Sequence, residues 1–452
     1  MKNKKNRHVK NFYLSLYFTA RFYIIGAVII LLFSFGHFSP VFFIIAKTSL
    51  LFLFAISLLD ILMLYRIKKP IYAERTLPER LSNGDENKIS LLLKNKSPIS
   101  FDVRIIDEIP AQFQIRNSEI KTKLKAKDEV ILGYLLKPVM RGEYHFGRLN
   151  VFISQSLSLI SRRIRFDLQT MVPVYPSYIQ MRKYELLAVS NRLTEAGIKK
   201  VRKLSHSLEF EQIRDYVKGD DYRTINWKAT ARRSQLMVNQ YLDEKSQRIY
   251  CIIDMGRSMK MPFDGMTLLD YAINSSLVLS NIAMHKQDKA GLISFSNKTH
   301  TILPAERSSM QMKRILESLY NQETNFSEPN FEQLYTTIKR KINQRSLLVL
   351  FTNFEWHISL MRQIKFLRQL SRSHLLVVVL FKNTELSALI KVEAKSLDKI
   401  YLKTIAEKLS FEKRLIVKEL QKYGIQCILT EPKDLSVQSI NKYLELKAMG
   451  QI

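Results

Sequence analysis

The stretch RIYCIIDMGRS, residues 248–258, passes from an apolar run into a polar loop, and it is the first of several such runs in the C-terminal part of the chain. An unbroken run of β-branched and aromatic residues indicates a strand that is buried on both faces. Further apolar runs of the same kind follow at 290–295, 347–351, 375–381 and 425–429. Amphipathic segments between them predict helices at 268–283, 310–320, 331–342, 358–370 and in a Lys/Glu-rich stretch that ends at Tyr423. This alternation predicts a doubly wound α/β domain over residues 248–452, with a parallel sheet covered on both faces.

Polar residues follow two of the expected strands. Ligands of open α/β sheets bind outside the carboxyl ends of the strands, so these residues form the candidate site. Asp254 and Ser258 follow the first strand, and Asn353 follows the strand at 347–351.

The loop at 254–258 resembles the Asp-x-Ser-x-Ser loop of the von Willebrand factor A fold, which holds a magnesium ion. The resemblance implies Asp254, Ser258, Thr324 and Asn353 as the metal-site positions, with Ser327 as a less favoured choice in place of Thr324. Gly256 stands where the family has its middle serine, and Asn353 stands where it has an aspartate. Losing one hydroxyl and one carboxylate weakens Mg²⁺ ligation. We expect a degenerate site that binds no metal ion and whose polar residues cap helices and fix loops. The alternative is a working site, with Mg²⁺ as its cofactor.

A second resemblance lies upstream, in the stretch EFEQIRDYVKGDDYRTINWKATARR, residues 209–233. It closely matches the signature of the bacterial family catalogued as domain of unknown function 58. The likeness extends to paired N-terminal spans, a β domain with RGEY at 141–144, and VYP at 174–176. One departure is SQSLSL at 154–159, where related chains have an Asp-Pro-x-Gly-Leu run. The resemblance implies partnership with a MoxR-type AAA+ ATPase.

The signature mixes arginines and acidic residues around one tryptophan. The candidates for partner binding are Arg214, Asp215, Gly219, Asp220, Asp221, Arg223, Trp227 and Arg232. The competing interpretation is an ion-paired strap that packs Trp227 against the sheet. We expect Trp227 to be buried.

The N-terminal 69 residues predict two transmembrane helices. Residues 22–46 and 48–59 contain no Asp, Glu, Lys or Arg, and Gly36, His37, Ser39 and Pro40 break the run. Basic residues flank both outer ends of this hairpin, at Lys2, Lys4, Lys5, Arg7, Lys10, Arg66, Lys68 and Lys69. By the positive-inside rule, both termini are expected in the cytoplasm, with the chain a multi-pass protein of the inner membrane.

Between the membrane segment and the α/β domain, the pattern changes to short alternating runs. Runs at 88–93, 101–106, 130–134 and 149–153 are separated by turn residues, which predicts an antiparallel β-sandwich over residues 70–180. Residues 181–247 form a linker region that carries the signature. The chain is therefore expected to have four parts, 1–69, 70–180, 181–247 and 248–452.

Composition narrows the classes of function. The 452 residues carry a formal net charge of +30 and include two cysteines, Cys251 and Cys427, in apolar runs. No nucleophile and base are spaced for catalysis, and no Gly-rich phosphate loop occurs in the sequence. We expect a non-enzymatic, membrane-tethered interaction module, an adaptor or partner of the ATPase in envelope protein maturation or stress response.

The net charge of +30 suggests an alternative, a polyanion-binding or nucleic-acid-binding protein at the membrane surface. Basic clusters recur on several segments, such as 162–165 and 199–203, and do not form one stripe interleaved with aromatic residues. A nucleic-acid partner is therefore not expected.

Overall fold

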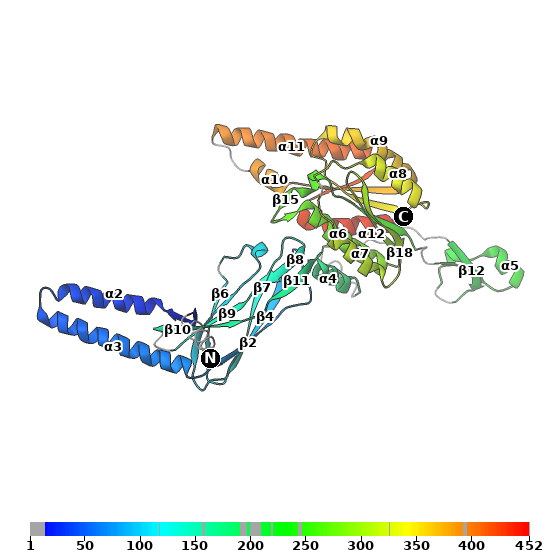
Figure 1. The fold of residues 1–452 in the computed structure, drawn as a ribbon. Coiled ribbons are helices and arrows are strands. Elements are labelled where there is room, and N and C mark those ends of the chain that lie inside the picture. The colour runs from blue at the N-terminus through cyan, green and yellow to red at the C-terminus, as the bar shows by residue number, and fades with distance from the viewer. Residues whose placement is uncertain are drawn as a thin grey trace. The chain divides into compact units, whose positions relative to one another are not determined.

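The computed structural model describes residues 14–116, 118–155, 159–189, 197–198, 209–217, 220–242, 246–324, 326–391 and 396–451. The chain forms two compact units, Met1–Val174 and Tyr175–Ile452. Both units combine helices and strands, as the sequence predicts (Figure 1).

Two apolar helices, α2 (Ala20–Phe35) and α3 (Pro40–Tyr65), begin the first unit (Figure 1, blue). The break between them falls at the predicted Gly and Pro. A Cβ atom on Gly36 would lie 3.2 Å from the Cα of Phe43, so the glycine allows the two helices to approach closely. Beyond it, the rings of Phe33 and Phe43 meet edge to face at 5.7 Å.

Of the described helices, α3 alone is long and apolar enough to cross a membrane. Its 26 residues extend ~39 Å, whereas the 16 residues of α2 extend ~24 Å against ~30 Å of bilayer hydrocarbon. The first helix cannot extend toward the N-terminus, because β1 (Leu16–Phe18) pairs with β10 (Ile160–Phe166). Helix length therefore supports one candidate span, and it does not support the predicted two-span hairpin.

The end of α3 is fixed to the β-rich part of the same unit. The Arg162 guanidinium donates to three carbonyls at this helix end, those of Leu64 (2.8 Å), Ile67 (2.9 Å) and Lys68 (3.0 Å). Leu64 lies in the last turn of α3, where carbonyls otherwise remain unpaired, and Ile67 and Lys68 follow the helix. One turn earlier, the Asp60 carboxylate accepts from the Ile160 backbone N–H at 3.1 Å. The last turns of α3 are thus held by β10.

The strands of the first unit form three sheets among the described residues, with the orders β1-β10-β9-β5-β6, β2-β4-β7 and β3-β11-β8. The remaining bounds are β2 (Ile71–Thr76), β3 (Leu81–Ser82), β4 (Asn87–Asn95), β5 (Phe101–Asp107), β6 (Glu119–Leu124), β7 (Glu129–Leu136), β8 (Gly142–Phe146), β9 (Leu149–Ser154) and β11 (Thr170–Tyr175). Burial alternates along β2, β4 and β5, as period-two patterning predicts. Leu91 and Leu93 share one core with Val103 and Val151, so the first two sheets face each other.

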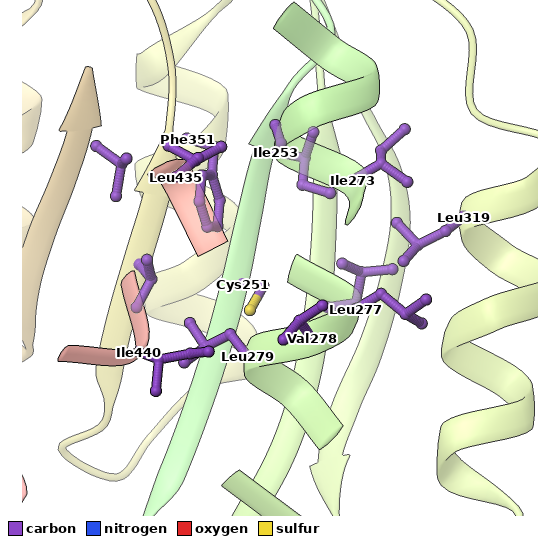
Figure 2. Packing of buried hydrophobic residues seen from close by; sticks show 14 of the residues in the cluster. Cys251, Ile253, Ile273, Leu277, Val278, Leu279, Leu319, Phe351, Leu435 and Ile440 are labelled. Carbon is purple, nitrogen blue, oxygen red and sulfur yellow. The ribbon is translucent and has the colours of Figure 1, made fainter. Parts of the chain in front are cut away.

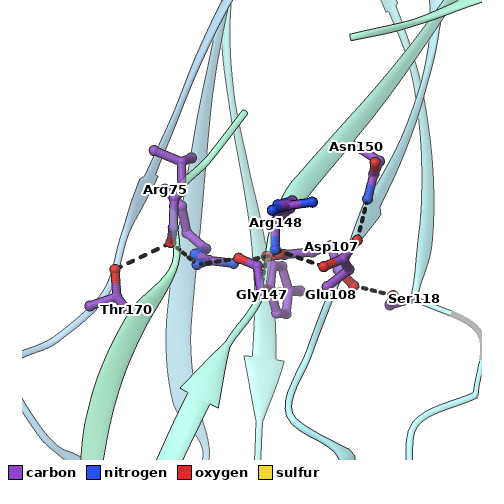
Figure 3. A network of polar contacts seen from close by, with 10 residues as sticks. Arg75, Asp107, Glu108, Ser118, Gly147, Arg148, Asn150 and Thr170 are labelled. Carbon is purple, nitrogen blue, oxygen red and sulfur yellow. Dashed lines mark hydrogen bonds and ion pairs between the residues drawn. The ribbon is translucent and has the colours of Figure 1, made fainter. Parts of the chain in front are cut away.

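A buried charge pair joins this β-rich part (Figure 3). Arg75 Nη1 lies 2.5 Å from Asp107 Oδ1, and the Tyr134 hydroxyl donates to Asp107 Oδ2 at 2.5 Å. Arg75 also donates to the carbonyls of Gly147 and Leu168. Burial raises the pKa of Asp107, which the Tyr134 hydrogen bond and the Arg75 charge oppose. Through Arg75, Asp107 and Tyr134, these contacts join β2, β5 and β7.

The second unit contains a six-stranded sheet in the order β18-β17-β14-β19-β20-β21. The strands are β14 (Arg248–Asp254), β17 (Lys289–Phe295), β18 (Thr299–Glu306), β19 (Leu347–Phe351), β20 (Leu375–Phe381) and β21 (Gln426–Thr430). Neighbouring strands are parallel except for β18, which is antiparallel to β17. The prediction of a wholly parallel sheet is therefore wrong at this edge. β18 is only half-buried and carries no apolar run.

Helices cover both faces of the sheet, as predicted. They are α6 (Leu268–His285), α7 (Gln311–Tyr320) and α12 (Leu435–Ala448) over one core, and α8 (Phe331–Lys341), α9 (His357–Ser373) and α11 (Leu397–Lys422) over the other. Two further helices of the second unit are α4 (Tyr178–Val189) and α10 (Thr384–Lys391). Figure 2 shows Cys251 of β14 beside Leu277 and Val278 of α6 in the first core.

The signature segment folds as a unit that the sequence analysis did not predict. β12 (Glu209–Asp215) pairs with β13 (Met237–Leu242) as an antiparallel hairpin. The short helix α5 (Trp227–Arg233) lies between the two strands in the chain. We call residues 209–242 the signature hairpin.

Candidate functional site

The carboxyl ends of β14 and β19 meet at the point where the strand order reverses. β17 and β18 lie on one side of β14, while β19, β20 and β21 lie on the other. Such a switch point is where open α/β sheets bind ligands. Asp254 ends β14, and Thr352 and Asn353 follow β19, so two of the four predicted site residues, Asp254 and Asn353, lie at this edge.

Asp254 is fully buried, and both of its carboxylate oxygens are hydrogen-bonded. Oδ1 accepts from the Gly256 backbone N–H at 2.7 Å, and Oδ2 accepts from the Thr352 hydroxyl at 2.6 Å. Burial raises the pKa of Asp254 to about 6, and the two hydrogen bonds act against that rise. Thr352 directly follows a buried strand in the sequence, beside Asn353, but the sequence analysis assigned it no role in the site.

Gly256 stands where the metal-binding loop would have its middle serine. A Cβ atom there would lie 2.8 Å from Cδ of Pro329, so any side chain would displace this neighbouring loop. The same loop accepts a hydrogen bond at 3.1 Å from the Arg257 N–H to the Ser327 carbonyl. The structure therefore brings Ser327, the less favoured choice, to the Asp254 loop.

The other two predicted positions are half-buried. Ser258 lies in a 3-10 turn, Arg257–Lys260, directly after the loop, and Thr324 precedes residue 325, which lies outside the described residues. Among the described residues, no hydrogen bond joins either side chain to Asp254. Neither prediction is tested by this arrangement.

Asn353 contacts a buried cation that belongs to the chain itself. Lys413 Nζ, from α11, donates to Asn353 Oδ1 and to the Phe354 carbonyl, each at 2.5 Å. Burial lowers the pKa of Lys413 to about 8, and the charge of Glu355 opposes that change. At neutral pH the ammonium is therefore mostly protonated. The sequence analysis missed Lys413 because a lysine in a Lys/Glu-rich helix has the pattern of a solvated face.

These contacts fit a magnesium centre poorly. Mg²⁺ prefers near-octahedral oxygen ligation, with carboxylates and several waters. Among the residues that the structure describes, no group of three or more His, Cys, Asp or Glu side chains could hold a metal ion. The amide oxygen of Asn353 already faces an ammonium group, and Pro329 closes the middle position of the loop. We therefore derive no metal-dependent step.

A cleft of about 650 Å³ lies beside Asn353 and Lys413. It opens at the carboxyl ends of β20 and β21. Its apolar lining includes Met261, Phe263, Trp356, Phe381, Leu386 and Leu429. An apolar cleft with a few polar groups at one wall is typical of a ligand site.

One ion pair and several hydrogen bonds to backbone N–H groups hold the signature hairpin together. Arg214 donates to both carboxylate oxygens of Asp220, at 2.8 and 2.7 Å. Asp220 also accepts from the Val217 N–H at 2.8 Å, and Asp221 accepts from the Arg223 N–H at 3.0 Å. The Arg214 hydrogen bonds lower the pKa of Asp220. These contacts join residues 214–217 to residues 220–223, and Gly219 lies outside the described residues.

Trp227 is 69% exposed, so the prediction of a buried tryptophan is wrong. It begins α5, a helix of seven residues, where Asn226 caps the first turn by accepting from the Ala229 N–H at 3.0 Å. So short a helix buries little of its surface. Tyr222 is 70% exposed in the same segment, and Asp215 and Arg232 are exposed as well. The predicted partner-binding residues thus lie on one small, solvent-exposed hairpin.

Solved structures are similar to parts of this chain only at low sequence identity and low TM-score. The PapD-like domain 7 of human CEP192 is 14% identical with a TM-score of 0.19, covering 25% of this chain and 91% of that chain. The CARDB domain of the PF1109 protein from Pyrococcus furiosus is 17% identical with a TM-score of 0.17, covering 24% of this chain and 93% of that chain. Such low TM-scores carry no conclusion about this protein.

Sequence relatives are more informative. The chain is 27% identical over 267 residues to the uncharacterized protein YeaD of Bacillus subtilis (strain 168). This match spans 57% of the chain and 64% of YeaD, which is less than two thirds of that relative. Residues 212–397, which include most of the signature hairpin and much of the six-stranded sheet, match the family described as "Protein of unknown function DUF58".

Proposed function

We propose that this chain is a non-enzymatic, membrane-tethered interaction module whose signature hairpin docks onto a MoxR-type AAA+ ATPase. The family resemblance implies such a partner. ATP hydrolysis then belongs to the partner, and this chain contributes a membrane anchor and a docking surface for envelope protein maturation or stress response.

The observation that carries the proposal is the exposure of Trp227 on an ordered hairpin. Trp, Tyr and Arg are the residue types that dominate binding energy at protein interfaces. Here Trp227 and Tyr222 are each about two-thirds exposed in one short segment, close in sequence to Arg223. Because Arg214 and Asp220 already order the turn, docking loses less conformational entropy than it would for a mobile loop.

The strand order of the second unit supports a finer proposal about its fold. A sheet with one antiparallel edge strand and a switch point between β14 and β19 is consistent with the von Willebrand factor A-like fold implied by the 254–258 loop. We propose this fold for residues 248–452.

We also propose that α2 and α3 both cross the inner membrane, with both termini in the cytoplasm. α2 is short, but local bilayer thinning can accommodate a short span. The basic flanks support this orientation. Reporter fusions at Met1, Lys69 and Ile452 should all give a cytoplasmic signal. A periplasmic signal at Met1 with a cytoplasmic one at Ile452 would show a single span.

Co-purification tests the docking proposal. Tagged full-length chain, purified from native membranes, should bring down an AAA+ ATPase that mass spectrometry identifies. Trp227→Ala should lower its recovery by tenfold or more, since losing an interface hot spot costs about 2 kcal/mol or more. Tyr401→Ala is the matched control, because Tyr401 is an equally exposed aromatic residue, on α11. Equal recovery with wild type and Trp227→Ala would contradict the proposal.

A further inference from the structure

The cleft at the carboxyl ends of β20 and β21 has the size and lining of a small-ligand site. Its volume of about 650 Å³ falls inside the range of small-molecule pockets. Phe381 ends β20, Leu386 comes from α10, and Leu409 comes from α11, so three separate elements supply its apolar wall. Burying such a wall against an apolar ligand body would be favourable.

Of the three basic residues that line the cleft, Lys382 pairs with Glu431 at 3.5 Å and Arg414 is exposed, whereas Lys413 is hydrogen-bonded to the cleft wall. Lys413 has three N–H donors, and two of them donate to uncharged acceptors, the amide oxygen of Asn353 and the carbonyl of Phe354. Glu355 and Glu385 also line the cleft, yet neither forms an ion pair with Lys413 among the described residues. The charge of Glu355 acts on Lys413 without a direct ion pair, so an anion in hydrogen-bond contact with the ammonium would offset more of the cost of burying it.

We propose that this cleft binds a small ligand that carries one carboxylate on an apolar body, with Lys413 holding the carboxylate. One carboxylate oxygen can accept the N–H donor that the two contacts of Lys413 leave. A phosphate group would require more donors than Lys413 supplies. The site is separate from the signature hairpin and does not depend on the proposed ATPase partner.

The chain contains its own reporter for this site. It has two tryptophans, and Trp356 lines the cleft with 44% exposure. In full-length Trp227→Phe protein, held in a neutral detergent, the fluorescence of Trp356 should change saturably on titration with 4-phenylbutyrate. The neutral isostere 4-phenylbutyramide has the same apolar body and controls for partition into detergent. It should bind at least about tenfold more weakly, because it lacks the charge-assisted hydrogen bond.

Three variants in the same background test the assignment. Lys413→Met, which keeps the length of the side chain, should weaken 4-phenylbutyrate binding at least about tenfold. Arg414→Met removes a neighbouring charge from the same cleft wall and should bind as the parent does. Ser387→Phe fills the cleft while leaving Lys413 in place, and it should also abolish binding, so the test survives if Lys413→Met does not fold.

Three results would overturn the proposal: no saturable response to 4-phenylbutyrate, equal binding of acid and amide, or equal losses in Arg414→Met and Lys413→Met.

Discussion

Replacing Asp254 by Asn should remove a pH-dependent destabilisation from the second unit. Burial raises the pKa of Asp254 from 3.8 to about 6. Because the folded-state pKa lies above the unfolded value, the favourable contribution is complete below the unfolded pKa and is lost as pH rises through about 6. A difference of about two pKa units corresponds to about 3 kcal/mol, since one unit is about 1.4 kcal/mol.

The two variants at this position separate charge from hydrogen bonding. In Asp254→Asn, the amide oxygen can still accept from the Gly256 N–H, and the Thr352 hydroxyl can turn to accept from the new NH₂ group. We therefore expect this variant to be at least as stable as wild type at about pH 8, with a flatter pH profile. Asp254→Ala leaves the two donors buried without an acceptor, and it should be destabilised at every pH by about 1–3 kcal/mol for each donor.

Trp356 fluorescence in a Trp227→Phe background reports unfolding of the second unit alone, which matters because a two-unit chain need not unfold in one step. Denaturant titrations at about pH 5 and pH 8, with and without millimolar Mg²⁺, complete the experiment. A wild type more stable than Asp254→Asn at the higher pH without Mg²⁺ would refute the charge argument. A rise in the wild-type midpoint with Mg²⁺ that Asp254→Asn abolishes would show that the loop binds the metal after all.

Three further predictions follow from close packing and burial. Gly256→Ser should restore the missing hydroxyl without restoring Mg²⁺ binding, and the clash with Pro329 should lower stability by about 1–3 kcal/mol in the same titration. Arg75→Met should destabilise the first unit by about 3–5 kcal/mol by leaving Asp107 unpaired, whereas Arg75→Met combined with Asp107→Leu should recover most of that loss in thermal unfolding. The pKa of the Cys251 thiol is raised by burial to about 11, so mass spectrometry should find it unalkylated in native protein and modified after unfolding.

Local patterns in the sequence were sufficient to predict much of the framework. The strand predicted at 347–351 is β19 with the same bounds, and the predicted break in the apolar segment is the turn between α2 and α3. The polar residues after β14 and β19 gather at one edge, as the topology rule requires. Each of these features depends on residues close together in the chain, which is why periodicity and turn residues reveal it.

Other features were decided only when distant segments met. β1 pairs with β10 across about 140 residues and limits the length of α2. Trp227 is exposed because its short helix buries little surface, although a tryptophan by itself favours burial. Lys413 reaches Asn353 over 60 positions and places a cation at the carboxyl edge of the sheet. The sequence therefore determined the parallel strands of the second unit, the helices that cover them and the edge where the candidate site lies, while tertiary packing decided which side chains face it, since burial and charge pairing depend on neighbours that are remote in the chain.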